Sequence, residues 1–154
     1  MHFTKWEDSI GETCKRFGNK LSTPYSYNRK EKLKSRKLIQ QVFESGKAFS
    51  QFPIKIIWLL HSNTSTSPVQ AAVSVGKKQF KLAVKRNRVK RLLREAYRLN
   101  KQDLLAAVPQ DKRLAIFIIY IDKELPQLPL LNRKMQLALN RLSKEISEAP
   151  ASNS

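Results

Sequence analysis

The sequence predicts an α+β protein: a small four-stranded mixed sheet packed with three helices, in the order α-β-β-β-α-β-α. Two observations carry this prediction. Segments whose apolar residues recur at helical spacing alternate with short runs rich in β-branched and aromatic residues. The chain has 154 residues and is 41% hydrophobic, which is enough for one buried core. We therefore expect one domain with short tails.

The first helix is predicted after a strongly basic block, "RKEKLKSRK", at 29–37. Ser35 suits the N-cap position and Gly46 the position just after the helix. Between them, apolar residues repeat at helical spacing, namely Leu38, Ile39, Val42 and Phe43.

Three of the four strands can be placed from composition. "FPIKIIWLL", 52–60, is rich in β-branched and aromatic residues, and Pro53 should lie at its start or on a sheet edge. A loop is expected at 62–68, followed by a strand at 69–76. The most apolar run, 113–121, predicts a central strand covered on both faces.

Two more helices complete the domain. A long basic helix should begin near Leu82 and run to about Asn100, with 103–108 continuing or closing it. A final amphipathic helix is expected at about 131–147. One of its faces is apolar, with Leu131, Met135, Leu139, Leu142 and Ile146.

The domain is expected to span 29–147. Residues 1–28 are aperiodic and are interpreted as a poorly ordered N-terminal extension. Residues 148–154 have the composition of a disordered tail.

The charge balance points to a polyanionic partner. Thirty Lys and Arg against 12 Asp and Glu give a net charge of +18, far more than solubility requires. DNA, RNA or an anionic membrane could supply the opposite charge. One Cys excludes an internal disulfide, and two His argue against a zinc site. No apolar run approaches the roughly 18 residues of a membrane span, and no signal sequence is recognisable, so a soluble cytoplasmic protein is expected.

The basic helix separates its charges from its apolar residues. At 100° per residue, one arc holds Val89, Leu92, Leu93, Ala96 and Leu99. The opposite half holds Arg86, Asn87, Lys90, Arg91, Arg94 and Arg98. Lys85 falls on the apolar arc and is therefore placed in the first turn, where it can reach solvent.

Three interpretations of this cationic face were compared. A solvated face usually mixes both signs, whereas Glu95 is the one acidic residue here. A membrane helix would need its apolar stripe free for lipid, but the core needs this stripe. Arginine matches phosphate oxygens with two parallel hydrogen bonds, which favours a nucleic acid.

The same residues resemble a known family. "RNRVKRLLREAYR" (86–98), preceded by "AAVSVGKK" (71–78), resembles the signature of the bacterial ribonuclease P protein component. "KLKSRKLIQQVFESGKAF" (32–49) resembles that family's first helix and the glycine after it. The resemblance covers about 29–147.

The resemblance implies a function. Proteins of this family bind a large catalytic RNA, and the complex removes the 5′ leader from precursor tRNA. The RNA, and not the protein, holds the catalytic magnesium ions, so no cofactor of the protein itself is expected. The implied partners are the catalytic RNA and precursor tRNA, with no DNA and no membrane. The family fold also has a left-handed crossover between its parallel strands, an exception to the usual rule.

The resemblance also implies two sets of site residues. Contacts with the catalytic RNA are expected from Lys77, Lys78, Arg86, Asn87, Arg88, Lys90, Arg91 and Arg94. The leader is expected in a cleft between the sheet and the first helix, lined by Ile39, Phe43 and Trp58. Ile39 departs from the Phe that is common at its position, and "QFKLAVK" (79–85) departs from a shorter, glycine-containing stretch.

Alternatives remain open for several of these residues. Phe43 and Trp58 could line the cleft or belong to the core, with the core favoured for Trp58. Asn87 could form a local hydrogen bond or contact RNA.

The acidic residues at the ends of the last strand are interpreted as turn residues and not as a magnesium site: Asp111, Asp122 and Glu124. His61 lacks a partner base or nucleophile in the sequence, so no catalytic residue is predicted in the protein. The main alternative function is a non-catalytic RNA-binding module, such as a ribosomal or RNA-chaperone protein.

Overall fold

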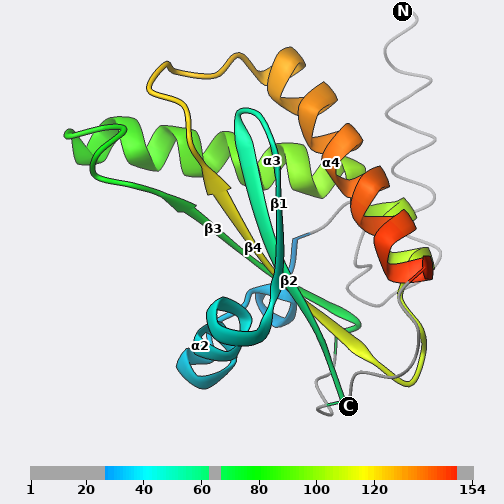
Figure 1. Ribbon diagram of the computed structural model, residues 1–154. Coiled ribbons are helices and arrows are strands. Elements are labelled where there is room, and N and C mark those ends of the chain that lie inside the picture. Colours follow the sequence, from blue (N-terminus) through cyan, green and yellow to red (C-terminus); the bar gives the residue numbers. More distant parts are fainter. Residues whose placement is uncertain (1–26, 63–66, 149–154) are drawn as a thin grey trace, which may run out of the picture.

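The computed structural model describes residues 27–62 and 67–148 (Figure 1). A 3-10 turn comes first, and the predicted order α-β-β-β-α-β-α follows it. The elements are η1 (Arg29–Glu31), α2 (Arg36–Ser45), β1 (Lys47–Gln51), β2 (Ile54–His61), β3 (Val69–Val75), α3 (Ala83–Ala107), β4 (Arg113–Tyr120) and α4 (Leu128–Glu148).

The four strands form one mixed sheet in the order β1-β2-β4-β3. β2 pairs antiparallel with both β1 and β4, while β3 pairs parallel with β4. α3 connects these two parallel neighbours, and the left hand of that crossover stays a prediction. The α+β class and the strand count are confirmed.

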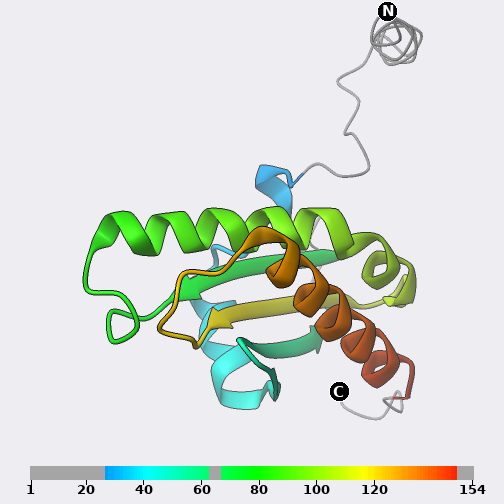
Figure 2. The same cartoon turned by 90° about the horizontal axis from the view of Figure 1, so that it is seen from above.

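The two faces of the sheet are covered unequally. Figures 1 and 2 show α3 and α4 on one side and the short α2 on the other. Alternation along β2 sends Ile54, Ile56 and Trp58 into the core beneath α3 and α4. Ile57 and Leu59 point the opposite way, toward α2. Because α2 has only 10 residues, it covers just part of its face.

Both predicted ends of α2 are confirmed. Ser35 Oγ accepts a hydrogen bond from the Leu38 N–H at 3.4 Å, and the Gly46 N–H donates to the Val42 carbonyl at 2.9 Å. Gly46 has a φ of −73°, so it is not needed for a left-handed conformation. It is needed for space, because a Cβ there would collide with the carbonyl oxygen of Val42 and lie 2.9 Å from that of Trp58.

The buried stripe of α3 differs from the predicted arc at its C-terminal half. Leu99 was expected in the core but is 38% exposed. Tyr97, Lys101 and Leu104 are buried instead. The reason is the segment before α2, because the Tyr97 ring packs against Tyr27 and Lys101 pairs with Glu31, while α4 packs along the rest of the stripe.

Most boundaries agree within two residues, with two exceptions. α4 begins at Leu128, three residues before the predicted start. β1 had no assigned position in the sequence. Of the predicted extension (1–28), residues 1–26 lie outside the described residues, as do 149–154 of the predicted tail. The domain limits 29–147 stay a prediction.

Candidate nucleic-acid interface

The cationic face of α3 lies on the side of the helix away from the core. Val89, Leu93 and Ala96 are fully buried, which fixes the rotation of the helix on the sheet. The predicted RNA-contacting side chains of α3 are therefore exposed or half-buried: Arg86, Asn87, Arg88, Lys90, Arg91 and Arg94. We call these six residues the α3 cationic face.

Carboxylates neutralise little of this face. Glu95 pairs with Arg98, whose hydrogen bond holds the pKa of the Glu95 carboxyl below its usual range. Across 27–62 and 67–148, the other ion pairs are Lys101–Glu31 and Arg141–Glu145. The cations of the α3 cationic face thus remain available to phosphate groups.

Arg86 has a structural task that the sequence did not reveal. Its Nη1 donates to the carbonyl of Phe80 at 2.8 Å and to that of Lys81 at 2.7 Å. These bonds attach the loop before α3 to its first turn. Among the residues that the structure describes, Nη1 is the one guanidinium nitrogen in these bonds, so the rest of the group can still donate to an anion.

The other predicted contacts lie close to the start of α3. Lys77 and Lys78 are exposed in the turn that follows β3. Asn87 is exposed, and its side chain has no hydrogen-bond partner within the described part of the chain. Its local alternative, a capping bond, is therefore not seen there. Lys85 lies in the exposed first turn, as expected.

The α2 face of the sheet, meaning the face that α2 partly covers, carries the second set. Phe43 is 50% exposed, and its ring meets that of Phe117 edge-on, with centroids 4.8 Å apart and an interplanar angle of 62°. Ile39 is half-buried beside them. The exposure of Phe43 excludes the core alternative and leaves an aromatic surface on which a base could stack.

Trp58 does not belong to this surface. The resemblance implied a place in the leader cleft, with the core as the favoured alternative. The core alternative is confirmed, because Trp58 is 3% exposed and packs in the core on the opposite side of the sheet. The cause is strand alternation, because Ile57 points to α2 and its neighbour must point away. Lys47 Nζ lies 5.6 Å from the Trp58 ring centroid.

The strand register supplies residues that sequence reasoning missed. Phe117 pairs with Ile57 on one side and Ala72 on the other, so these three share the α2 face. The next row along the same face joins Lys55 to Ile119. Phe117 and Ile119 are only partly buried, whereas their neighbours on β4 are buried. The sequence does not show this difference between the two faces, because the run 114–121 is apolar throughout. A search for aromatic residues at alternate positions of β4 would have found Phe117.

No group of three or more His, Cys, Asp or Glu residues gathers to hold a metal ion in the described ranges. Asp122 Oδ1 accepts the N–H groups of Lys123 and Glu124, at 2.7 and 3.3 Å, as a turn residue does. The two buried ring nitrogens of His61 have no hydrogen-bond partner among the described residues, and burial lowers the pKa of His61. None of the helices in these ranges combines the length and the apolar character that crossing a bilayer requires.

The fold and this surface define a class: a small α+β domain with one cationic helix and one aromatic sheet face, suited to single-stranded or folded RNA. The family model for ribonuclease P matches residues 27–143. The chain therefore belongs to the ribonuclease P protein component family. It is the protein subunit of the ribonucleoprotein endoribonuclease that processes precursor tRNA 5′ leaders.

Individual relatives agree. The chain is 39% identical over 131 residues to the ribonuclease P protein component of Porphyromonas gingivalis, covering 84% of this chain and 95% of the relative. The identity is 33% over 128 residues with that of Chlorobium phaeobacteroides, covering 76% and 88%. The RNase P protein of Staphylococcus aureus shares the fold, with a TM-score of 0.50 at 18% identity, covering 84% of this chain and 99% of that one.

Proposed function

We propose that this chain binds the catalytic RNA of ribonuclease P through the α3 cationic face, and that it holds the 5′ leader of precursor tRNA against the α2 face of the sheet. The carrying observation is the segregation of α3. The cations of the α3 cationic face lie together on the exposed side, and within 85–98 Glu95 is the single carboxylate among them.

The second contact rests on Phe43 and Phe117. Stacking on an aromatic ring tolerates any base, which suits a leader of variable sequence. Lys55 lies on the same face and adds a positive charge. A ribosomal or RNA-chaperone module would explain the cationic helix equally well, but it would not need this second surface.

The chemistry is assigned to the RNA. The described residues contain no cluster of three or more acidic, His or Cys side chains that could hold magnesium. We therefore place the catalytic magnesium ions on the RNA partner. The protein then contributes binding and positioning. We propose a cytoplasmic location and expect neither DNA nor a membrane as partner.

Reconstitution tests this proposal. The full chain is combined with its cognate catalytic RNA, and precursor tRNA cleavage is measured at low magnesium with and without protein. The protein should stimulate cleavage and leave a 5′-phosphate on mature tRNA, because its cations screen phosphate repulsion that magnesium otherwise screens. Nuclease-treated protein without RNA should not cleave.

Variants sharpen the test. Arg91→Ala should weaken assembly with the catalytic RNA, whereas Lys144→Ala, an exposed charge on α4, serves as the matched control. No stimulation by the wild-type protein, or robust cleavage by RNA-free protein, would contradict the proposal.

A further inference from the structure

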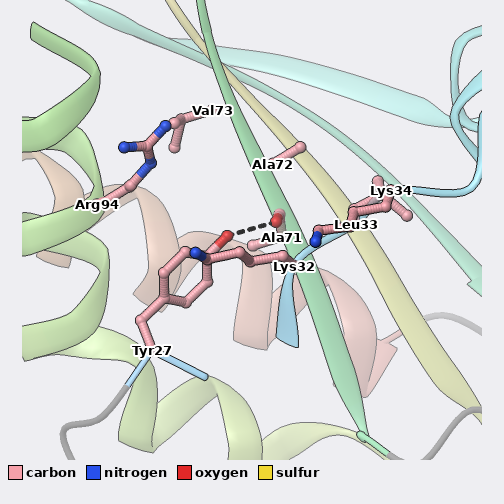
Figure 3. Close-up of a pocket in the computed structure, with 8 residues that line it drawn as sticks. All are labelled: Tyr27, Lys32, Leu33, Lys34, Ala71, Ala72, Val73 and Arg94. Atoms are coloured by element: carbon pink, nitrogen blue, oxygen red, sulfur yellow. Dashed lines mark hydrogen bonds between the residues drawn. The ribbon is translucent and has the colours of Figure 1, made fainter. Parts of the chain in front are cut away.

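A pocket of about 280 Å³ opens at the outer edge of the sheet. Three parts of the chain surround it: residues 27–34, which we call the strap, the edge strand β3, and α3 (Figure 3). Its lining consists of Tyr27, Lys32, Leu33, Lys34, Ala71, Ala72, Val73 and Arg94. None of these residues except Arg94 entered the predicted sites.

The strap is held firmly in place on β3. The Tyr27 hydroxyl donates to the Ala71 carbonyl at 2.6 Å, as Figure 3 shows, and the Leu33 N–H donates to the same oxygen at 3.0 Å. The Tyr27 ring also meets the Tyr97 ring edge-on, with centroids 5.6 Å apart. These contacts hold the wall of the pocket in place in the absence of a ligand.

A buried ion pair anchors the strap to α3. Lys101 Nζ lies 2.6 Å from Glu31 Oε2, and the Lys101 side chain is 2% exposed. This pair also leaves the pocket positively charged, because Glu31, the carboxylate next to Lys32 in the sequence, is engaged by Lys101. Lys32, Lys34 and Arg94 have no carboxylate within ion-pair distance among the described residues.

Three kinds of donor converge on the pocket. Arg94 offers its guanidinium from α3, and Lys32 offers an ammonium whose nitrogen lies 5.8 Å from the Tyr27 ring centroid. The third is backbone. Main-chain groups alternate between the two edges of a strand, so the Val73 N–H points to the same edge of β3 as the Ala71 carbonyl, beside the strap. Burial raises the pKa of Tyr27 to about 12, so its hydroxyl keeps its proton and its bond to Ala71.

We propose that this pocket binds a backbone phosphate of RNA, between Arg94 on α3 and Lys32 on the strap. Two cations beside an N–H donor match the charge and the acceptor oxygens of a phosphodiester. The proposal rests on the proposed function and extends it. Arg94 belongs to the α3 cationic face, while Leu33 and Ala72 pack with the α2 face, so the pocket joins the two surfaces.

The phosphate could come from the catalytic RNA or from the leader, and the experiment separates these sources. Full-chain Lys32→Ala and Arg94→Ala, and the double variant, are compared with wild type. One arm measures binding of protein to the catalytic RNA. The other measures binding of precursor and mature tRNA by the holoenzyme. Lys30→Ala is the matched control, since Lys30 is an exposed cation of the same strap outside the pocket lining.

Each pocket variant should weaken one arm by roughly 2- to 10-fold, the net value of one hydrogen bond of ordinary strength. A catalytic-RNA phosphate predicts the loss in assembly. A leader phosphate predicts the loss for precursor tRNA alone. In the double variant the two losses should not add, because both side chains would hold one phosphate. Thermal unfolding should stay unchanged, and Lys32→Gln repeats the test with a closer shape.

Pocket variants that match Lys30→Ala in both arms would overturn the phosphate site while leaving the proposed function intact. Additive losses in the double variant would also overturn it, since they would place the two cations on separate phosphates. Failure of the wild-type chain to bind the catalytic RNA would instead overturn the proposed function.

Discussion

The side chain of Phe43 is half exposed although it belongs to the apolar stripe of α2. Its partner Phe117 lies on a sheet face that α2 covers only in part, so neither ring is enclosed. An exposed aromatic pair of this kind contributes little to folding and can contribute much to binding a base.

Phe43→Ala should therefore weaken binding of precursor tRNA by the holoenzyme and leave binding of mature tRNA nearly unchanged. One stacked base is worth about 1–3 kcal/mol, or roughly 5- to 150-fold in affinity. Stability should fall by much less than the roughly 3–5 kcal/mol of a buried Phe. Leu137→Ala, which removes an apolar side chain that is 46% exposed on α4, is the control. Equal losses for both tRNAs would refute leader contact.

Gly46, directly after α2, allows this helix to approach β2 closely. Because a Cβ at this position would meet two carbonyl oxygens, Gly46→Ala should force α2 and β2 apart. We expect a loss of about 1–3 kcal/mol in the free energy of unfolding, measured by urea denaturation. Gly76→Ala is a useful comparison, since its Cβ would meet only the flexible end of the Gln79 side chain. A stable Gly46→Ala protein would show that the backbone can yield there.

At the scale of single residues, the sequence predicted which side chains could bind RNA better than it predicted the face on which each side chain lies. The cations of α3 were placed correctly because a helix of known phase needs only its apolar stripe to fix the exposed side. For Trp58 both the cleft and the core stayed open, with the core favoured, because β2 is apolar on both faces and alternation gave no signal. The task of Arg86 as a loop anchor depends on two backbone carbonyls, which no side-chain pattern reveals.

At the scale of elements, five of the seven main segments could be placed to within two residues, because each has a period or a cap signal of its own. β1 lacks both. It has five residues, "KAFSQ", and only Phe49 is buried, so pairing with β2 and not its own composition makes it a strand. The shift of the α3 stripe toward Tyr97 and Lys101 likewise came from a neighbour, the strap, through Tyr27 and Glu31.

One ion pair, between Glu31 and Lys101, adds to the hydrogen bonds and the ring contact that dock the strap. Glu31→Gln would leave Lys101 buried without its carboxylate, so we expect a loss of about 3 kcal/mol in the free energy of unfolding, measured by urea denaturation. Glu145→Gln removes an exposed pair with Arg141 and should cost roughly 0.5 kcal/mol or less. Equal losses in the two variants would mean that Lys101 finds another partner or reaches water.

At the scale of the whole molecule, the net charge of +18 governs association. Binding to the catalytic RNA should weaken steeply as salt rises, because each neutralised phosphate releases counterions. Arg91→Ala should make the plot of log affinity against log salt shallower by about one unit or less. Filter binding or calorimetry across a salt series measures this slope. An unchanged slope would remove Arg91 from the interface.

The unequal covering of the sheet has a consequence for how the two contacts combine. Arg91 belongs to α3 and Phe43 to α2, and these two helices lie on opposite sides of the sheet (Figure 1). Residues on opposite sides of a sheet, carried by different helices, are expected to contribute to binding independently. The losses of Phe43→Ala and Arg91→Ala should then add within about 0.5 kcal/mol in assembled enzyme. Substitutions on one side of the sheet would then change affinity for the leader without changing affinity for the catalytic RNA, and the reverse.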